Sequence, residues 1–222
     1  MSAPIEIKTK EKTYQARVPT SWSEVTLEQF YKWAAWAEQK TNRDWIKFYE
    51  IFTGLPYEIL AQVRVGSIIE TLDAWLEFIF KNTKDAELHK YPVPEFLEMT
   101  IGLHKKSMRV PRQIEQKQLG QKYALQLAFE ELREAHKNEP EYQLERAAMA
   151  IAVFMYQEIT DSQDFNLEFA KTYIPRIKKL PADKAIPIAV FFWNSYMELR
   201  RHGANNSKPN QNPSKLQLEL PD

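Results

Sequence analysis

Cysteine is absent from the 222-residue sequence, and glycine occurs only five times. Without cysteine the chain has no disulfide framework, no thiolate metal ligand and no cysteine nucleophile. The five glycines are scattered, whereas loops that hold phosphate groups need clustered glycines so that backbone amides can approach the anion. The sequence therefore contains neither a P-loop nor a dinucleotide-binding fingerprint.

The formal net charge is zero, because 30 Lys and Arg residues are matched by 30 Asp and Glu residues. This balance disfavours a general electrostatic attraction to nucleic acid or anionic lipid, and it gives little charge-based protection against self-association. The longest apolar runs, residues 147–156 and 185–196, are too short to cross a bilayer, and the charged N-terminus shows no secretory signal. We expect a soluble protein with no membrane partner.

Patterns of catalytic and metal-binding residues are lacking as well. The four histidines lie far apart, and none stands at helical spacing with another His, Asp or Glu in a known metal motif. No Gly-x-Ser-x-Gly elbow indicates a serine hydrolase. We predict a protein that is not an enzyme and uses no metal or cofactor. A hydrolase whose site is dispersed through the fold is the alternative, because such a site leaves no local pattern.

Apolar residues, in contrast, are plentiful: 44% of the chain is hydrophobic and 13% is aromatic, including six Trp. This is enough material for a packed interior. Most aromatic residues recur at helical spacing, which is typical of a core. Trp is also enriched at the centres of protein interfaces. We therefore name four Trp residues as candidates for partner binding: Trp22, Trp33, Trp36 and Trp45.

The hydrophobic period changes near Pro19, from the period of a strand to that of a helix. Apolar and polar residues alternate over residues 4–18 around a polar turn, which predicts a β-hairpin that ends at Pro19. From Thr26 the apolar residues follow a helical period, and Thr26 with Gln29 forms a capping box. Further helices are predicted from Asp44 to Gly54, after Pro56, and over residues 67–80.

Prolines at positions 92 and 94 interrupt a polar stretch that begins at Lys81, which indicates a boundary between two lobes. The predicted fold is mainly α, with an N-terminal β-hairpin followed by two helical lobes. Helices of the second lobe are predicted at residues 118–137, 141–159, 167–174 and 182–201, with Gly203 as the C-cap of the last. The predicted division is residues 1–82 for the hairpin and first lobe, 83–109 for a connecting segment, 110–203 for the second lobe and 204–222 for a flexible tail.

The tail is rich in Asn, Pro, Ser and Gln, a composition typical of flexible chain. Within it, Leu216, Leu218 and Leu220 alternate with polar residues, and such a segment can add a strand to the edge of a partner's sheet. A tail that stays in solvent is the more ordinary interpretation. We add these three leucines to the candidates for partner binding.

Two segments of the chain also resemble each other in sequence. Four residues recur at identical spacing: Val18, Pro19, Leu27 and Gln29 in the first place, and Val110, Pro111, Leu119 and Gln121 in the second. In both places a Val-Pro step leads to a long amphipathic helix. A duplicated helical lobe explains this pattern, and chance agreement over a few positions is the alternative.

Basic residues cluster between Lys105 and Arg112. No aromatic residues alternate with them, as a stacking platform for bases would require, so the pattern favours a solvated loop over a nucleic-acid site. We expect no specific nucleic-acid partner. A regulatory protein that binds nucleic acid through this cluster is the alternative.

Residues 47–60, with the sequence KFYEIFTGLPYEIL, join an apolar helix to a short helix through Thr-Gly-Leu-Pro. This arrangement resembles a pattern in tail assembly chaperones of tailed bacteriophages, in which a later helix ends in a run like residues 76–80. The preceding hairpin fits the same pattern. Residues 18–27, VPTSWSEVTL, also resemble the openings of small morphogenesis proteins in phages that infect Bacteroidetes-type hosts.

The resemblance covers residues 4–82. It implies a non-enzymatic morphogenesis protein that binds other phage structural proteins through apolar helix faces and self-associates. Such a protein acts in the host cytoplasm during assembly, or stays in the virion. No active-site residue is carried over, since the family has none. Because this chain is longer than the usual compact chaperone, a neck or tail ring component of the virion is the alternative.

Overall fold

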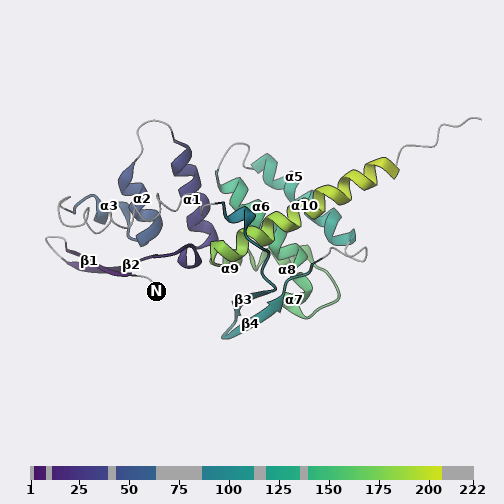
Figure 1. The fold of residues 1–222 in the computed structure, drawn as a ribbon, viewed down its shortest axis with the longest axis horizontal. Coiled ribbons are helices and arrows are strands. Elements are labelled where there is room, and N and C mark those ends of the chain that lie inside the picture. Colours follow the sequence, from purple (N-terminus) through teal and green to yellow (C-terminus); the bar gives the residue numbers. More distant parts are fainter. Residues whose placement is uncertain are drawn as a thin grey trace, which may run out of the picture.

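The computed structural model describes residues 3–8, 12–39, 44–63, 87–112, 119–135 and 140–206. In this part of the chain the protein is mainly helical and begins with an antiparallel β-hairpin, which confirms the predicted fold class. Figure 1 shows the first hairpin with α1, α2 and α3 at one end of the molecule, α5 to α10 at the other, and a second hairpin below the latter. The helix predicted over residues 67–80 lies outside the described residues.

The first hairpin consists of β1 (Ala3–Lys8) and β2 (Thr13–Val18), paired so that Ala3 lies opposite Val18. Its inner face is buried and its outer face is exposed, because side chains alternate between the two faces of a strand. A short 3-10 helix, η1 (Trp22–Glu24), leads to α1 (Leu27–Glu38). The predicted capping box is present: the Thr26 hydroxyl accepts from the Gln29 amide, and the Gln29 side chain accepts from the Thr26 amide.

Helix α2 (Trp45–Thr53) packs against α1 and has the predicted ends. At its start, the Asp44 carboxylate accepts hydrogen bonds from the next turn's backbone amides. At its end, Gly54 has a φ of 68°, a left-handed conformation that costs glycine little. Pro56 then precedes α3 (Tyr57–Leu60). Residues 47–60 therefore form a helix that ends at Gly54, followed by a short second helix.

A second hairpin corrects the prediction that residues 83–109 only connect two lobes. After η2 (Leu88–Lys90), the strands β3 (Phe96–Ile101) and β4 (His104–Arg109) pair antiparallel. Of the basic residues predicted to lie in a solvated loop, Lys105, Lys106 and Arg109 therefore belong to β4, and Arg112 follows it. Gly102 makes the two-residue turn possible, because its φ of 62° suits the first central position of a hairpin turn.

The second lobe contains α5 (Leu119–Ala135), α6 (Pro140–Phe154) and α10 (Ala182–Asn206), with three short helices between the last two: α7 (Tyr156–Thr160), α8 (Leu167–Lys171) and α9 (Ile174–Ile177). The helix predicted over residues 141–159 is thus divided into α6 and α7, and the one over 167–174 corresponds to α8 and the start of α9. Gly203 lies inside α10, so its prediction as a C-cap is wrong.

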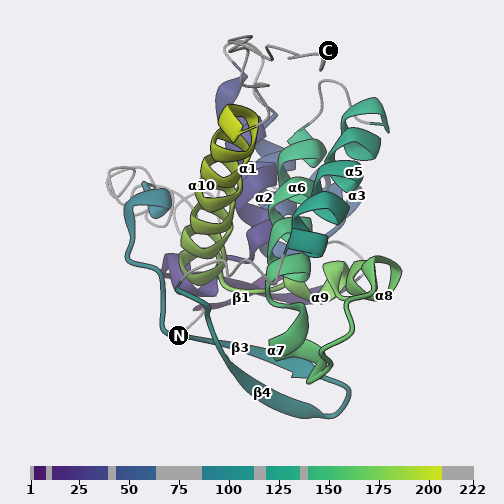
Figure 2. The same cartoon turned by 90° about the vertical axis from the view of Figure 1, so that its right-hand side faces the viewer.

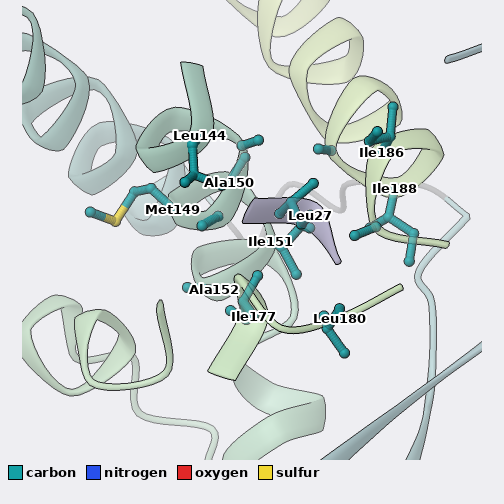
Figure 3. Close-up of a cluster of buried hydrophobic side chains, with 14 of the residues drawn as sticks. Leu27, Leu144, Met149, Ala150, Ile151, Ala152, Ile177, Leu180, Ile186 and Ile188 are labelled. Carbon is teal, nitrogen blue, oxygen red and sulfur yellow. The ribbon is translucent and has the colours of Figure 1, made fainter. Parts of the chain in front are cut away.

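Helix α6 lies at the centre of one core that both lobes share. It contacts α1, α5, α8, α9 and α10, and every residue from Ala147 to Tyr156 is buried. Leu27 of α1 lies beside Ile151 of α6 in the close-up of Figure 3. Backbone hydrogen bonds add to this packing, since the Leu27 amide donates to the Leu180 carbonyl and the Ala182 amide to the Val25 carbonyl. The predicted lobes therefore share the main core, and a smaller separate cluster of buried residues lies between the first hairpin and α2–α3.

A spacing of 92 residues relates the two hairpins and the helices that follow them. Glu6 pairs with Gln15 in the first hairpin, and Glu98 pairs with Ser107 in the second, so the registers coincide. Leu27 is the first residue of α1, and Leu119, 92 residues later, is the first described residue of α5. Five such pairs of positions are buried in both places: Ile7 and Met99, Ala16 and Met108, Val18 and Val110, Trp33 and Leu125, and Trp36 and Ala128.

This agreement supports the duplication hypothesis and extends the repeated element beyond a helical lobe. The repeated element is a hairpin followed by two packed helices, because α2 packs against α1 as α6 packs against α5. We call β1, β2, α1 and α2 the first unit, and β3, β4, α5 and α6 the second unit. The short helices α7 to α9 and the long α10 follow the second unit.

Candidate protein-binding site

Three of the four predicted partner-binding Trp residues lie in the core, which corrects their assignment. The side chains of Trp22, Trp33 and Trp36 are 8%, 7% and 2% exposed. The Trp36 indole donates to the Asp44 carbonyl at 2.8 Å, so its polar atom is satisfied within the chain. Trp45 is 45% exposed, and its ring packs on Trp36 with the ring centroids 5.0 Å apart. Leu216, Leu218 and Leu220 lie outside the described residues.

Exposed apolar side chains gather instead around the second hairpin. Most of the exposed large hydrophobic residues in the described part of the chain lie on the segment that leads into β3, on the hairpin, or on the neighbouring helix α8: Tyr91, Val93, Phe96, Leu103 and Phe169. Leu103, at the tip of the hairpin, is 96% exposed. Clustered apolar surface is typical of a site where another molecule binds. We call Phe96 at the start of β3, Leu103 in the turn and Phe169 on α8, together with the hollow that Phe169 lines, the hairpin site.

The hollow of the hairpin site has a volume of about 470 Å³. It lies between β4 and the helices α7 and α8, and its wall combines aromatic, aliphatic and charged groups: Ile101, His104, Lys105, Lys106, Ile159, Thr160, Asp161, Phe169 and Tyr173. The rings of Phe169 and Tyr173 meet edge to face, with centroids 5.5 Å apart. Rings held in this way offer a partner rigid apolar surface.

One ion pair ties β4 to α7 at the edge of the hollow. The Lys106 ammonium lies 2.6 Å from the Asp161 carboxylate and also donates to the Ile159 carbonyl at 3.3 Å. Asp161 ends α7 in the left-handed conformation, with a φ of 58°, which Asp tolerates better than most residues with a Cβ. These contacts hold the hairpin in place beside α7.

The inner face of the second hairpin anchors it to the protein while its tip projects. Leu97, Met99 and Met108 are buried in the main core, and β3 contacts α9 while β4 contacts α7. Figure 2 shows the hairpin at one end of the molecule, with its turn extending past the helices. Phe96 and Leu103 are exposed because they lie on the outer face and in the turn.

The basic residues of β4 are largely matched by carboxylates. Lys105 pairs with Glu98, Lys106 pairs with Asp161, and Arg109 lies 3.9 Å from Glu95. Such pairing leaves little excess positive charge for a phosphate backbone. The charge pattern of this strand therefore does not favour binding to a phosphate backbone.

Two other surface features lie away from the second hairpin. A hollow of about 860 Å³ between α1 and α2 is lined by apolar groups together with charged groups of both signs, among them Glu28, Lys32, Lys47 and Glu50. On the outer face of α5, Tyr123 and Leu127 are 65% and 59% exposed. The described part of the chain contains no group of three or more acidic or histidine residues able to hold a metal ion. Among the described helices, none is long and apolar enough to span a membrane.

Burial is the main cause of the raised pKa values of two groups, Asp183 and Tyr31. Burial raises the pKa of the Asp183 carboxyl, which lies in the first turn of α10. Burial also raises the pKa of Tyr31, which lies against α6 and α10. Both groups lie outside the lining of the hairpin hollow, so these two shifts reflect packing of the core.

This chain matches no protein-family model, no curated protein and no solved structure in comparisons with known proteins. Its function therefore has to be inferred from its own residues and surface.

Proposed function

We propose that this chain is a non-enzymatic bacteriophage morphogenesis protein that binds another virion protein through the hairpin site. The observation that carries the proposal is the concentration of exposed Phe96, Leu103 and Phe169 around a hairpin that is fixed to the core. The phage assignment rests on the resemblance of residues 47–60 to tail assembly chaperones. The helix, glycine stop and short helix formed by these residues support it.

The hairpin site has the properties of an interface centre. Large aromatic side chains in a partner interface commonly contribute about 2 kcal/mol or more each to binding. The Lys106–Asp161 pair and the buried inner face fix the hairpin before binding, so that little conformational entropy is lost when the complex forms. The chain acts in the host cytoplasm during assembly.

The test replaces Leu103 with Asp and Phe169 with Ser, and measures binding to the co-expressed products of neighbouring virion genes. We expect each change to weaken the complex by about 30-fold, the equivalent of about 2 kcal/mol. Thermal unfolding should be unchanged by Leu103→Asp, because that side chain is 96% exposed. The matched control is Leu127→Ser on α5, which is also exposed. Unaltered binding by both hairpin variants, or equal loss with the control, would contradict the hairpin site.

A neck or tail ring component is the second candidate, since the second unit and α10 extend well beyond the stretch that resembles the chaperones. Mass spectrometry of purified particles separates the two roles. An assembly chaperone leaves the particle, whereas a ring component is present in the finished virion at a fixed copy number.

A further inference from the structure

Strand β4 has an unpaired edge. The Val110 amide donates to the Glu95 carbonyl, and bonded and non-bonded pairs alternate along an antiparallel ladder. This register turns the backbone N–H and C=O groups of Lys105, Ser107 and Arg109 away from β3. In the described part of the chain these outward groups make no hydrogen bond. Such a row of free backbone groups is a template for another strand.

The side chains along this edge are exposed on one face and buried on the other. Lys105, Ser107 and Arg109 are exposed, Lys106 is half-buried and Met108 is buried. A strand added to β4 would therefore meet basic side chains on its outer face. On its inner face it would meet Lys106 and the apolar side chains of Ile159 and Phe169 that line the hollow. The best match is a strand with alternating apolar residues and an acidic residue between them.

Residues 215–220 of the tail, with the sequence KLQLEL, have this pattern. Leu216, Leu218 and Leu220 fall on one face of an extended strand, and Lys215, Gln217 and Glu219 fall on the other. With the leucines on the inner face, Glu219 lies on the same face as Lys105 and Arg109. Opposite charges on neighbouring strands stabilise their pairing. Pro221 marks the end of the segment, since proline cannot donate to a ladder.

The tail cannot reach β4 of its own chain. Helix α10 has 25 residues, so it is about 37 Å long at 1.5 Å per residue. The second hairpin lies beyond the N-terminal end of α10 (Figure 2), while the tail leaves from the opposite end. Leu216 comes ten residues after Asn206, a span of at most about 35 Å even when fully extended. The strand that fits β4 must therefore come from a second copy.

We propose that residues 215–220 of one copy pair with the β4 edge of a second copy. The chain then self-associates by strand addition, and each copy carries both the donated strand and the accepting edge. This inference gives a site to the self-association implied by the proposed function. It can be tested on the purified chain alone, so that its failure is distinguishable from failure to bind a virion partner.

The first experiment compares the full chain with a chain that stops at Asn206, by sedimentation velocity over a range of concentrations. We expect the full chain to form dimers or larger species as the concentration rises, and the shortened chain to stay monomeric. A labelled peptide of residues 214–222 should bind the shortened chain in an anisotropy titration. Equal association of both chains, or a peptide that does not bind, would overturn the proposal.

Two proline variants of the shortened chain locate the edge. Ser107→Pro removes an outward amide of β4, and Thr100→Pro removes an outward amide of β3, so neither breaks a hydrogen bond between the two strands. We expect Ser107→Pro to weaken peptide binding about tenfold or more, and Thr100→Pro to change it by less than about twofold. Equal effects of the two variants would place the peptide elsewhere.

A third measurement leaves the protein unchanged, in case Ser107→Pro does not fold. The peptide is N-methylated in turn at Gln217 and at Leu218, two positions whose amides face opposite edges of the added strand. Binding should fall about tenfold or more for the amide that faces β4 and stay nearly constant for the other. Two peptides that bind as well as the unmodified one would rule out strand addition.

Discussion

The first and second units share a backbone plan but differ in what covers them. In the first unit, α1 lies against α6 and α10, and its residue Tyr31 is half-buried there. In the second unit, the matching residue of α5 is also a tyrosine, Tyr123, and it is 65% exposed. The same residue type at the same position is thus packed against other helices in the first unit and exposed in the second. Its environment is decided by the elements that pack on the unit and not by the unit itself.

The two hairpins show a similar difference. The first packs against α2, and its residues Ile7 and Ala16 form a small core with Leu55 and Leu60. The second hairpin contributes its inner face to the main core and contacts α7 and α9. Because the larger core anchors the second hairpin, its tip and outer face can project without loss of order. This difference is the reason why we propose that a partner binds at the second hairpin and the neighbouring α8.

The strongest test of the duplication compares two matched core positions. Trp33→Ala in α1 and Leu125→Ala in α5 each remove a large buried side chain, 7% and 0% exposed in the native protein. We expect each to lower the free energy of unfolding by about 3 kcal/mol, since truncation leaves a cavity in the shared core. Urea denaturation measures both. A cost below about 1 kcal/mol at either position would show that the two helices are not packed in equivalent ways.

A pair of tyrosine variants tests whether other helices pack on α1 but not on the matching face of α5. Tyr31→Ala removes a ring packed against α6 and α10, and should cost about 2 kcal/mol of unfolding free energy. Tyr123→Ala removes a ring that is 65% exposed, and should change stability by no more than about 0.5 kcal/mol. Thermal unfolding in calorimetry gives both values under the same conditions. Similar losses of unfolding free energy for the two variants would mean that other elements pack on this face of α5 as they do on α1.

The capping box distinguishes the starts of the two helices. Thr26→Ala removes the hydroxyl that accepts from the Gln29 amide, and should lower stability by about 1 kcal/mol. The matching position in the sequence is Gln118, a residue type without strong capping preference, and Gln118→Ala should have little effect. Chemical denaturation of both variants makes the comparison. A large cost at Gln118 would indicate a capping role that its residue type does not predict.

The smallest expected effect concerns the ion pair that is particular to the second hairpin. Lys106 occupies the position that Tyr14 has in the first hairpin, and it pairs with Asp161, whose side chain is 82% exposed. Lys106→Ala should cost about 0.5 kcal/mol of unfolding free energy at low salt, and the cost should shrink as salt is added. Arg112→Ala, at an exposed position just after the hairpin, is the control. A cost that does not depend on salt would assign the effect to packing of the lysine stem.

Local signals explain what could be predicted from the sequence. The first hairpin, the capping box at Thr26 and the stop at Gly54 each depend on a few neighbouring residues, and each is present in the structure. The sequence gives only a weak signal for the second hairpin, in which Leu97 and Met99 alternate with polar residues before Gly102. The basic residues of β4 have the composition of a solvated loop, because their pairing with Glu98, Asp161 and Glu95 is visible only in three dimensions.

Other features depend on tertiary packing and have no local pattern. The side chains of Trp22, Trp33 and Trp36 are typical of an interface as much as of a core, and only the position of the surrounding helices decides between them. Gly203 was expected to end α10, yet the helix runs on to Asn206, since a glycine in a helix costs only about 1 kcal/mol. The hairpin site brings together Leu103 and Phe169, which lie far apart in the sequence.

The central position of α6 has a consequence for the order of events during synthesis. Leu27 is fully buried beside Ile151, and 124 residues separate them. At a translation rate of about 5–20 residues per second, the ribosome takes roughly 6–25 seconds to make the intervening chain. Throughout that interval the apolar face of the first unit has no α6 to cover it. Newly made first units on neighbouring ribosomes of one messenger are therefore open to mispairing with each other, and slower translation before α6 should lower the yield of folded protein.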